Sequence, residues 1–234
     1  MYIFMHSANN VCSFYCLSFN NIERKTHMKN RFTQLNLDVH FYDGVNNDDE
    51  RISIPLKNND VGIEGGWSCM YGHLDMINKF LNDTDKEYGV FCEDDVYIHK
   101  ELANDIPKII HDFKTMNLDV LLLGYLITYH PSTEKNIKNY YSYNDHLWGS
   151  QMYMISRSHA KNLIHKYYGD YAVQSLTEPM TPFSADWTIT KDGNRAIVYP
   201  MYAVEDGKKK YGWKDQENLH IGTFTYNYNE LNFI

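Results

Sequence analysis

Hydrophobic positions along this chain alternate between two spacings, one typical of β-strands and one typical of α-helices. Short apolar runs predict strands over residues 13–19, 37–42, 88–92, 120–123, 151–155 and 196–199. Apolar residues three or four positions apart predict helices between them, with stripes that begin at Ile22, Met70 and Leu102. A further helix is predicted from Ser156 to Tyr168, capped by Ser156 or Ser158. The alternation predicts an α/β fold with a mostly parallel central sheet.

Some segments interrupt this pattern. Residues 43–66 are rich in Asn, Asp and Gly and are predicted as a long loop, while the tail beyond residue 207 has too little periodicity for an assignment. The apolar run from Val120 to Leu123 predicts a strand buried on both faces, beside the strand at 88–92. With no internal repeat and no linker, residues 1–234 are expected to form one domain.

Charge and composition narrow the classes of function. The formal net charge of -8 argues against a general nucleic-acid binder, because affinity for the phosphate backbone comes from clustered Lys and Arg. The sequence has no apolar run of 18 residues, so no membrane span is expected. Residues 1–19 are interrupted by His6, Asn9 and Asn10 and have no basic lead, so no signal peptide is expected either. The four cysteines form no C-x-x-C pair and are interpreted as reduced structural thiols. A cytoplasmic protein is therefore expected, in the host cytoplasm if the source is viral.

The most prominent candidate for chemistry is the acidic triplet Glu93, Asp94 and Asp95, a DXD-like motif directly after a buried strand. Adjacent carboxylates raise one another's pKa unless a cation lies among them, and Mg²⁺ or Mn²⁺ is the natural partner for such oxygen ligands. Open α/β sheets also bind ligands at the carboxyl ends of their strands.

Alternation along an extended segment points Glu93 and Asp95 to one side. We therefore expect Asp95 as the leading metal ligand and Glu93 close to the nucleotide or the metal, with Asp94 contacting the cofactor or capping the following turn. From the triplet alone, a phosphatase, a nucleotidyltransferase, a calcium site and a solvated acidic turn all stay open.

Several further segments, in order along the chain, complete a recognisable pattern. They are 14–19 with Glu23 and Arg24, 41–45, 66–73 with Cys69 and His73, 88–96, 121–124, 149–157 with Tyr153 and Ser156, and 183–187 with Asp186. Together they resemble glycosyltransferase family 25, which includes bacterial lipooligosaccharide galactosyltransferases and procollagen galactosyltransferases. Gly72 departs from the family's usual Ser. The resemblance covers about residues 13–205, and 206–234 is expected to be a C-terminal extension or lid.

This resemblance implies a GT-A-type, Rossmann-like nucleotide-sugar-binding domain with a UDP-sugar donor and a manganese-type cofactor, Mn²⁺ or Mg²⁺. It implies transfer of a hexose, galactose or glucose, to a hydroxyl acceptor on a glycan or protein. The procollagen members invert the anomeric centre, which requires a base, and Asp186 is our candidate. Asp186 has two alternatives to this role. It would cap a helix or form a local turn, or it would bind the metal or the acceptor.

Other residues are weaker candidates. His73 is expected to begin a helix after a Gly-rich turn, where it would contact phosphate or sugar, or else to be a buried, hydrogen-bonded histidine. His220 is a candidate for the metal shell, with a structural role as the alternative. Arg24, or the run Lys208 to Lys210, would help to hold the diphosphate, although a solvated loop is the simpler reading of the lysines. Aromatic residues that form either an acceptor wall or core are Tyr129, Tyr140, Tyr141, Tyr143 and Trp148.

Two other functions remain open at the level of sequence. The same carboxylates would serve a metal-dependent phosphohydrolase or nucleotidyltransferase. The second alternative is an inactive module that binds a nucleotide-sugar or a glycan. The presence of the complete triplet favours an enzyme over such a module.

Overall fold

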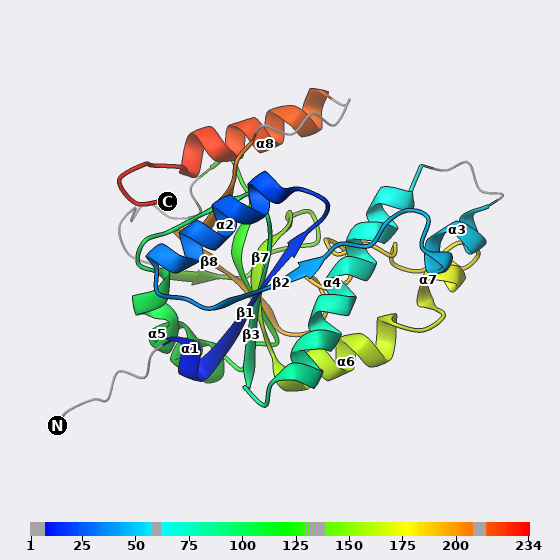
Figure 1. Cartoon of the computed structure of the whole chain (residues 1–234), viewed down its shortest axis with the longest axis horizontal. Coiled ribbons are helices and arrows are strands. Elements are labelled where there is room, and N and C mark those ends of the chain that lie inside the picture. Colours follow the sequence, from blue (N-terminus) through cyan, green and yellow to red (C-terminus); the bar gives the residue numbers. More distant parts are fainter. Residues whose placement is uncertain (1–7, 58–61, 130, 132–138, 208–213) are drawn as a thin grey trace.

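The computed structural model describes residues 8–57, 62–129, 131, 139–207 and 214–234. Its main sheet has the strand order β2-β1-β3-β7-β5-β8-β6 (Figure 1). The strands are β1 Cys12–Ser18, β2 Val39–Asp43, β3 Tyr88–Glu93, β5 Val120–Leu126, β6 Asn139–Tyr141, β7 Trp148–Ser156 and β8 Arg195–Tyr199. A second, two-stranded sheet pairs β4 Val96–Ile98 with β9 Ala203–Glu205.

Most strands of the main sheet share one direction. β1 is parallel to both β2 and β3, and β5 is parallel to β8. β7 is antiparallel to β3 and β5, and β6 is antiparallel to β8. The predicted α/β fold with a mostly parallel central sheet is therefore confirmed. The predicted adjacency of the strands at 88–92 and 120–123 is wrong, because β7 lies between them and pairs with both.

Helices cover both faces of this sheet (Figure 1). They are α1 Ala8–Val11, α2 Ile22–Gln34, α3 Glu50–Leu56, α4 Glu64–Asp83, α5 Leu102–Thr115, α6 Arg157–Tyr167, α7 Tyr171–Gln174 and α8 Lys214–Asn227. Alternate residues of β1 face opposite layers, since Tyr15 packs in the core beneath α4 and α6 and Phe14 in the core beneath α2 and α5. This two-sided burial explains the nearly continuous apolar run of β1.

Helix α6 begins directly after Ser156, one of the two predicted capping residues. The Ser156 side chain accepts a hydrogen bond from the amide of His159 at 3.2 Å, which satisfies an N–H that has no partner within the helix. Ile22 departs from its prediction, because it is 85% exposed and the buried stripe of α2 consists of Met28 and Phe32.

The predicted loop at 43–66 contains regular structure. Helix α3 begins after Asp49, whose side chain accepts from the amide of Arg51. The Arg51 guanidinium also binds Asp75 of α4 at 2.8 Å, which ties this seven-residue helix to its neighbour. A helix of seven residues that contains Pro55 is too short to show a readable period, so only tertiary contacts reveal it.

The tail also forms a helix that the sequence pattern did not indicate. The two most buried residues of helix α8, His220 and Thr223, are polar, so the helix has no regular apolar stripe. The chain then returns to β4, where the backbones of Ile98 and Ile234 exchange hydrogen bonds of 3.0 Å. The prediction of a single domain with a C-terminal extension or lid stays a prediction. No helix in the described ranges has both the length and the hydrophobicity needed to cross a membrane.

Candidate active site

The acidic triplet divides at the end of β3. Glu93 is the last residue of the strand, and Asp94 and Asp95 form the turn that leads to β4. Nη1 of Arg24, in the first turn of α2, lies 3.3 Å from Oδ1 of Asp94 and 3.3 Å from Oδ2 of Asp95. The Ser18 hydroxyl donates to the other oxygen of Asp94 at 2.7 Å. Among the described residues, Arg24 is therefore a cation that lies between these two carboxylates.

Electrostatics agree with this pairing. Burial lowers the pKa of Arg24, but the attraction of Asp95, Asp94 and Asp206 outweighs it and leaves the pKa above its ordinary value. The predicted alternation of the triplet is wrong in detail, because the backbone turns after Glu93. Asp94 and Asp95 consequently share one guanidinium, while Glu93 points to a separate cavity.

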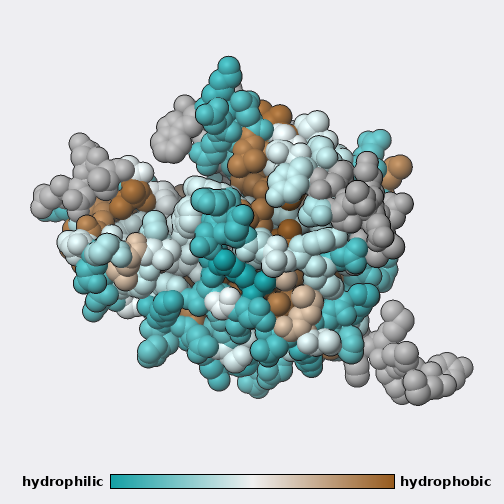
Figure 2. Space-filling view, turned by 180° about the vertical axis from the view of Figure 1, so that it is seen from behind, coloured by the Kyte–Doolittle hydropathy of each residue, from teal (hydrophilic) through white to brown (hydrophobic). Residues whose placement is uncertain are grey.

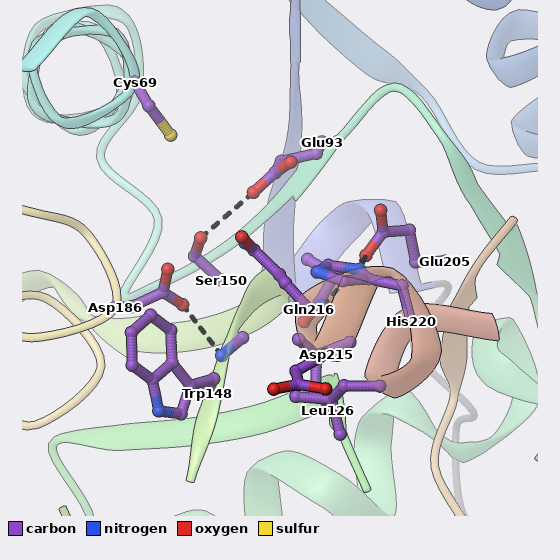
Figure 3. Close-up of a pocket in the computed structure, with 13 residues that line it drawn as sticks. Cys69, Glu93, Leu126, Trp148, Ser150, Asp186, Glu205, Asp215, Gln216 and His220 are labelled. Carbon is purple, nitrogen blue, oxygen red and sulfur yellow. Dashed lines mark hydrogen bonds and ion pairs between the residues drawn. The ribbon is translucent and has the colours of Figure 1, made fainter. Parts of the chain in front are cut away.

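That cavity, of about 510 Å³, opens where β3 and β5 end and the antiparallel β7 begins. Figure 3 shows Glu93, Ser150 and Asp186 projecting into it, with α8 closing the side that carries His220. Its described lining consists of Cys69, Glu93, Leu126, Trp148, Gly149, Ser150, Gln151, Asp186, Glu205, Asp215, Gln216, Leu219 and His220. Asp95 and Arg24 are not among these residues.

Asp186 is the candidate base, and it lies on the wall of this cavity. Its Oδ1 accepts a 2.7 Å hydrogen bond from the amide of Gly149 at the start of β7. Its Oδ2 has no hydrogen-bond partner among the described residues. Burial, followed by the charge of Glu93, raises the pKa of Asp186 above its ordinary value of 3.8, against the opposing effect of the Gly149 amide. Such a carboxylate is a stronger base than one in water.

His220 also reaches the cavity, with a carboxylate partner that the sequence pattern did not indicate. Its Nδ1 lies 2.7 Å from Oε2 of Glu205, the last residue of β9, and both side chains are buried. The side-chain amide of Gln151 donates a hydrogen bond to the same oxygen at 3.3 Å. On the opposite wall, the hydroxyl of Ser150 donates to Oε1 of Glu93 at 3.0 Å.

His73 occupies a different position from the one expected. Helix α4 begins at Glu64, so His73 lies in the middle of the helix, fully buried, rather than at its start. Exposed amides at a helix N-terminus are therefore not available beside it. Its Nδ1 lies 2.9 Å from the hydroxyl of Tyr153 on β7, and its Nε2 lies 3.8 Å from Oε1 of Glu93. His73 is thus buried and hydrogen-bonded, and its predicted contact with the phosphate or sugar stays a prediction.

Of the five aromatic candidates, only Trp148 lines the cavity as the structure describes it. Trp148 is 41% exposed, and its ring packs edge-on against Trp187 at a centroid distance of 5.4 Å. Tyr140 instead donates to Asp112, and Tyr143 donates to the backbone of Thr190. Lys208 to Lys210 lie outside the described residues. Three further lining residues, Ser150, Gln151 and Glu205, were missed because isolated polar residues at strand ends carry no sequence signal.

The surface near the site is mixed in character. Most of the face in Figure 2 is hydrophilic. Its hydrophobic residues form a strip that runs from the upper part of the molecule to its centre and a second group at the left. Exposed apolar side chains near the C-terminal end of the chain include Ile221 and Tyr226 of α8.

Comparison with known proteins adds a family and two distant structural likenesses. The crystal structure of a protein from STIV has 14% identity and a TM-score of 0.44, with 83% of each chain covered. The crystal structure of a glycosyltransferase involved in the glycosylation of the major capsid of PBCV-1 has 10% identity and a TM-score of 0.38, covering 90% of this chain and 98% of that one. No curated protein matches the sequence.

The family model of glycosyltransferase family 25 (LPS biosynthesis protein) matches residues 13–177. This segment contains Arg24, Cys69, His73 and the acidic triplet, and it ends before Asp186 and His220. The resemblance expected up to about residue 205 is therefore matched only to 177. A match that spans more than half of the chain identifies the protein: it belongs to glycosyltransferase family 25.

Proposed function

We propose that this glycosyltransferase moves a hexose, galactose or glucose, from a UDP-sugar to a hydroxyl group of a glycan or protein, with inversion at the anomeric carbon. Membership of the family makes the chain a glycosyltransferase that uses a nucleotide-sugar donor and an acceptor. The observation that carries the finer proposal is Asp186, a carboxylate of raised pKa on the wall of a cavity at the ends of β3 and β5.

Asp186 would act on the acceptor. As the acceptor oxygen forms its bond to the anomeric carbon, its proton passes to Oδ2 of Asp186. The bond between that carbon and the donor phosphate breaks, and its electron pair leaves with UDP. The amide of Gly149 holds Oδ1 at 2.7 Å and so fixes the direction in which the carboxylate points. Attack from the side opposite the leaving group gives inversion.

Trp148 and Trp187 supply the apolar surface beside this base. Their rings meet edge-on, and Trp148 lines the cavity that Asp186 also lines. Aromatic faces pack against the C–H surface of a sugar ring while leaving its hydroxyl groups to polar neighbours. We therefore propose that the acceptor sugar, or an aromatic or apolar part of a protein acceptor, rests on this pair.

A divalent cation, Mn²⁺ or Mg²⁺, belongs to the proposal as the group that would offset the charge of the diphosphate. The predicted ligands Asp95, Glu93 and His220 do not line one common site, because Glu93 and His220 face the cavity and Asp95 does not. Asp95 has a side chain that is 1% exposed and paired with Arg24, and it does not line the cavity. Their role stays a prediction, and no step above depends on it.

The competing enzyme classes differ in what they do without an acceptor. A phosphohydrolase using these carboxylates would cleave the diphosphate quickly in water, whereas a transferase would release UDP slowly until an acceptor hydroxyl is present. An inactive binding module would do neither. Release of UDP from UDP-galactose and UDP-glucose, with and without sugar acceptors, therefore separates the three functions.

Donor binding is tested by thermal denaturation with UDP-glucose, UDP-galactose and their N-acetyl relatives, each with Mn²⁺ and with a chelator. A ligand that binds the folded state raises its stability by about 2.7 kcal/mol at 100 times its dissociation constant. We expect the largest increase in Tm with a UDP-hexose and Mn²⁺. An unchanged Tm with every UDP-sugar would contradict the proposed donor.

A further inference from the structure

A cysteine and a glutamate that line the cavity, Cys69 and Glu93, lie next to a fully buried histidine, His73. Cys69 and His73 are four residues apart on α4, so they lie on the same face of the helix. That face meets the end of β3, where Glu93 projects into the cavity (Figure 3). The thiol of Cys69, a ring nitrogen of His73 and a carboxylate oxygen of Glu93 all lie within 4.8 Å of one another.

His73 provides a separate indication that a ligand belongs here. Its ring is fully buried, and Nε2 has no hydrogen-bond partner among the described residues. The nearest carboxylate oxygen, Oε1 of Glu93, lies at 3.8 Å, which is too long for a hydrogen bond. When Nδ1 donates to the hydroxyl of Tyr153 at 2.9 Å, the lone pair is on Nε2, the atom that faces Glu93.

We propose that Cys69, His73 and Glu93 form a binding site for a zinc-type transition-metal ion, whose fourth coordination position faces the cavity. A thiolate, an imidazole and a carboxylate are the ligands that zinc takes in proteins, and three protein ligands with one open position are typical of its reactive sites. Mg²⁺ and Mn²⁺ favour sets of oxygen ligands instead.

The distances suit one tetrahedral ion. Zinc lies about 2.3 Å from sulfur and about 2.0–2.1 Å from nitrogen or oxygen, so its ligand atoms lie about 3.3–3.6 Å apart. The 3.8 Å between His73 and Glu93 is close to this separation. Tyr153 would be the outer partner of the histidine, fixing its ring as such partners do in metal sites. Ser150, which donates to Glu93 at 3.0 Å, would fix the carboxylate in the same way.

A cation at this position would also change the charge of the cavity. The described lining contains four carboxylates, Glu93, Asp186, Glu205 and Asp215, and no Lys or Arg. A diphosphate entering such a cavity is repelled unless a cation is present. A contact between this ion and the donor phosphates rests on the proposed function. The metal site itself does not depend on that function.

The test measures metal binding in the full-length protein without nucleotide. Protein stripped of metal by a chelator is titrated with Zn²⁺ in a calorimeter and with Co²⁺ in a spectrophotometer. We expect one equivalent to bind, and the Co²⁺ form to show a thiolate-to-cobalt charge-transfer band in the near ultraviolet. Because UDP-sugars are absent, failure of the transfer reaction would leave this result unaffected.

Cys69→Ser is the decisive variant, since it replaces one atom on a half-buried position. It should abolish the charge-transfer band and weaken Zn²⁺ binding by about 100-fold or more, while Tyr153→Phe should cost about 10–100-fold. Cys12→Ser is the matched control, because the Cys12 thiol donates to the carbonyl of Ala8 at 3.4 Å, as a serine hydroxyl also can. It should bind metal like the wild type.

Three results would overturn the proposal, and the first two concern the ligands themselves. One is a wild-type Co²⁺ complex without the thiolate band. The other is Zn²⁺ affinity that is unchanged in both Cys69→Ser and Glu93→Gln, with circular dichroism showing that these variants are folded. Binding that disappears only in His220→Ala would assign the ion to the Glu205 side of the cavity and would also contradict the site.

Discussion

Nη1 of Arg24 lies 3.3 Å from Oδ2 of Asp95, a side chain that is 1% exposed and belongs to the turn after β3. The same nitrogen reaches Asp94, so one guanidinium balances two carboxylates. The distances exceed the roughly 2.7–2.9 Å of an optimal charge-assisted hydrogen bond. Arg24 therefore neutralises the turn without holding it in the tightest geometry.

The first prediction concerns the stability that this pairing contributes. Arg24→Ala removes the guanidinium that Asp94 and Asp95 share, and we expect the free energy of unfolding to fall by about 2 kcal/mol. Urea denaturation measures it. Lys25→Ala on the same helix is the control, because Lys25 pairs with the exposed Asp43 and should cost about 0.5 kcal/mol or less. Equal losses in the two variants would show that the buried pair has no special role.

The second prediction concerns UDP and metal. Four carboxylates line the described cavity, so we expect UDP to bind more tightly with Mn²⁺ than with a chelator. The sequence prediction further expects Asp95→Ala to lose the metal-dependent part of the affinity while it stays folded. Calorimetry of both proteins, with Mn²⁺ and with chelator, measures this. Equal affinities of wild type and variant with Mn²⁺ would remove Asp95 from the donor site.

The third prediction separates binding from chemistry at Asp186. Asp186→Asn keeps the shape of the side chain and an oxygen for the Gly149 amide, so UDP affinity should be unchanged. Turnover should fall by roughly 10²-fold or more, the usual contribution of a general base. Loss of UDP and metal binding together would place Asp186 in a metal shell. Transfer at the wild-type rate would leave it a role in local structure only.

The fourth prediction uses the raised pKa of the same carboxyl group. Asp186 must be ionised to act as a base, so kcat/KM, which reports the pKa of the free enzyme, should rise with pH through a midpoint above the ordinary 3.8. The folded state also binds the Asp186 proton more tightly than the unfolded state, so this group destabilises the fold once the pH exceeds the unfolded value. Asp186→Asn should therefore be more stable than the wild type at pH 7, and the difference should shrink as the pH falls toward 4. Denaturation at both pH values measures it.

The fifth prediction concerns the backbone that positions this base. Gly149 has φ +133, and a Cβ atom there would lie 2.7 Å from Cα of Tyr125 and would clash with Oε1 of Gln151. Gly149→Ala should lower the free energy of unfolding by about 1–3 kcal/mol and reduce turnover, because the amide that binds Asp186 moves. Gly169→Ala is the control, since nothing lies within 4 Å of the added atom. A Gly149→Ala variant with wild-type turnover would contradict the role of this amide.

The sequence by itself determined the class of the fold and the family. Strands buried on both faces and helices with apolar stripes leave periodic signals that depend only on local burial, and β1, β3, β5, β7 and β8 all carry them. Ordered motifs such as the triplet at the end of β3 identified the family, since they are short and contiguous.

Only the tertiary structure decided which of these residues act together. The distance between Glu93 and Asp186 along the chain is 93 residues, and contacts at such separations follow from sheet order, which the insertion of β7 between β3 and β5 changed. Because the backbone turns after Glu93, Asp95 contacts Arg24 whereas Glu93 lines the cavity. The alternation of side chains ends where the extended backbone ends. The convergence of His73 with Cys69 and Glu93, like the pairing of His220 with Glu205, arises from packing between elements, and packing leaves no periodic trace in the sequence.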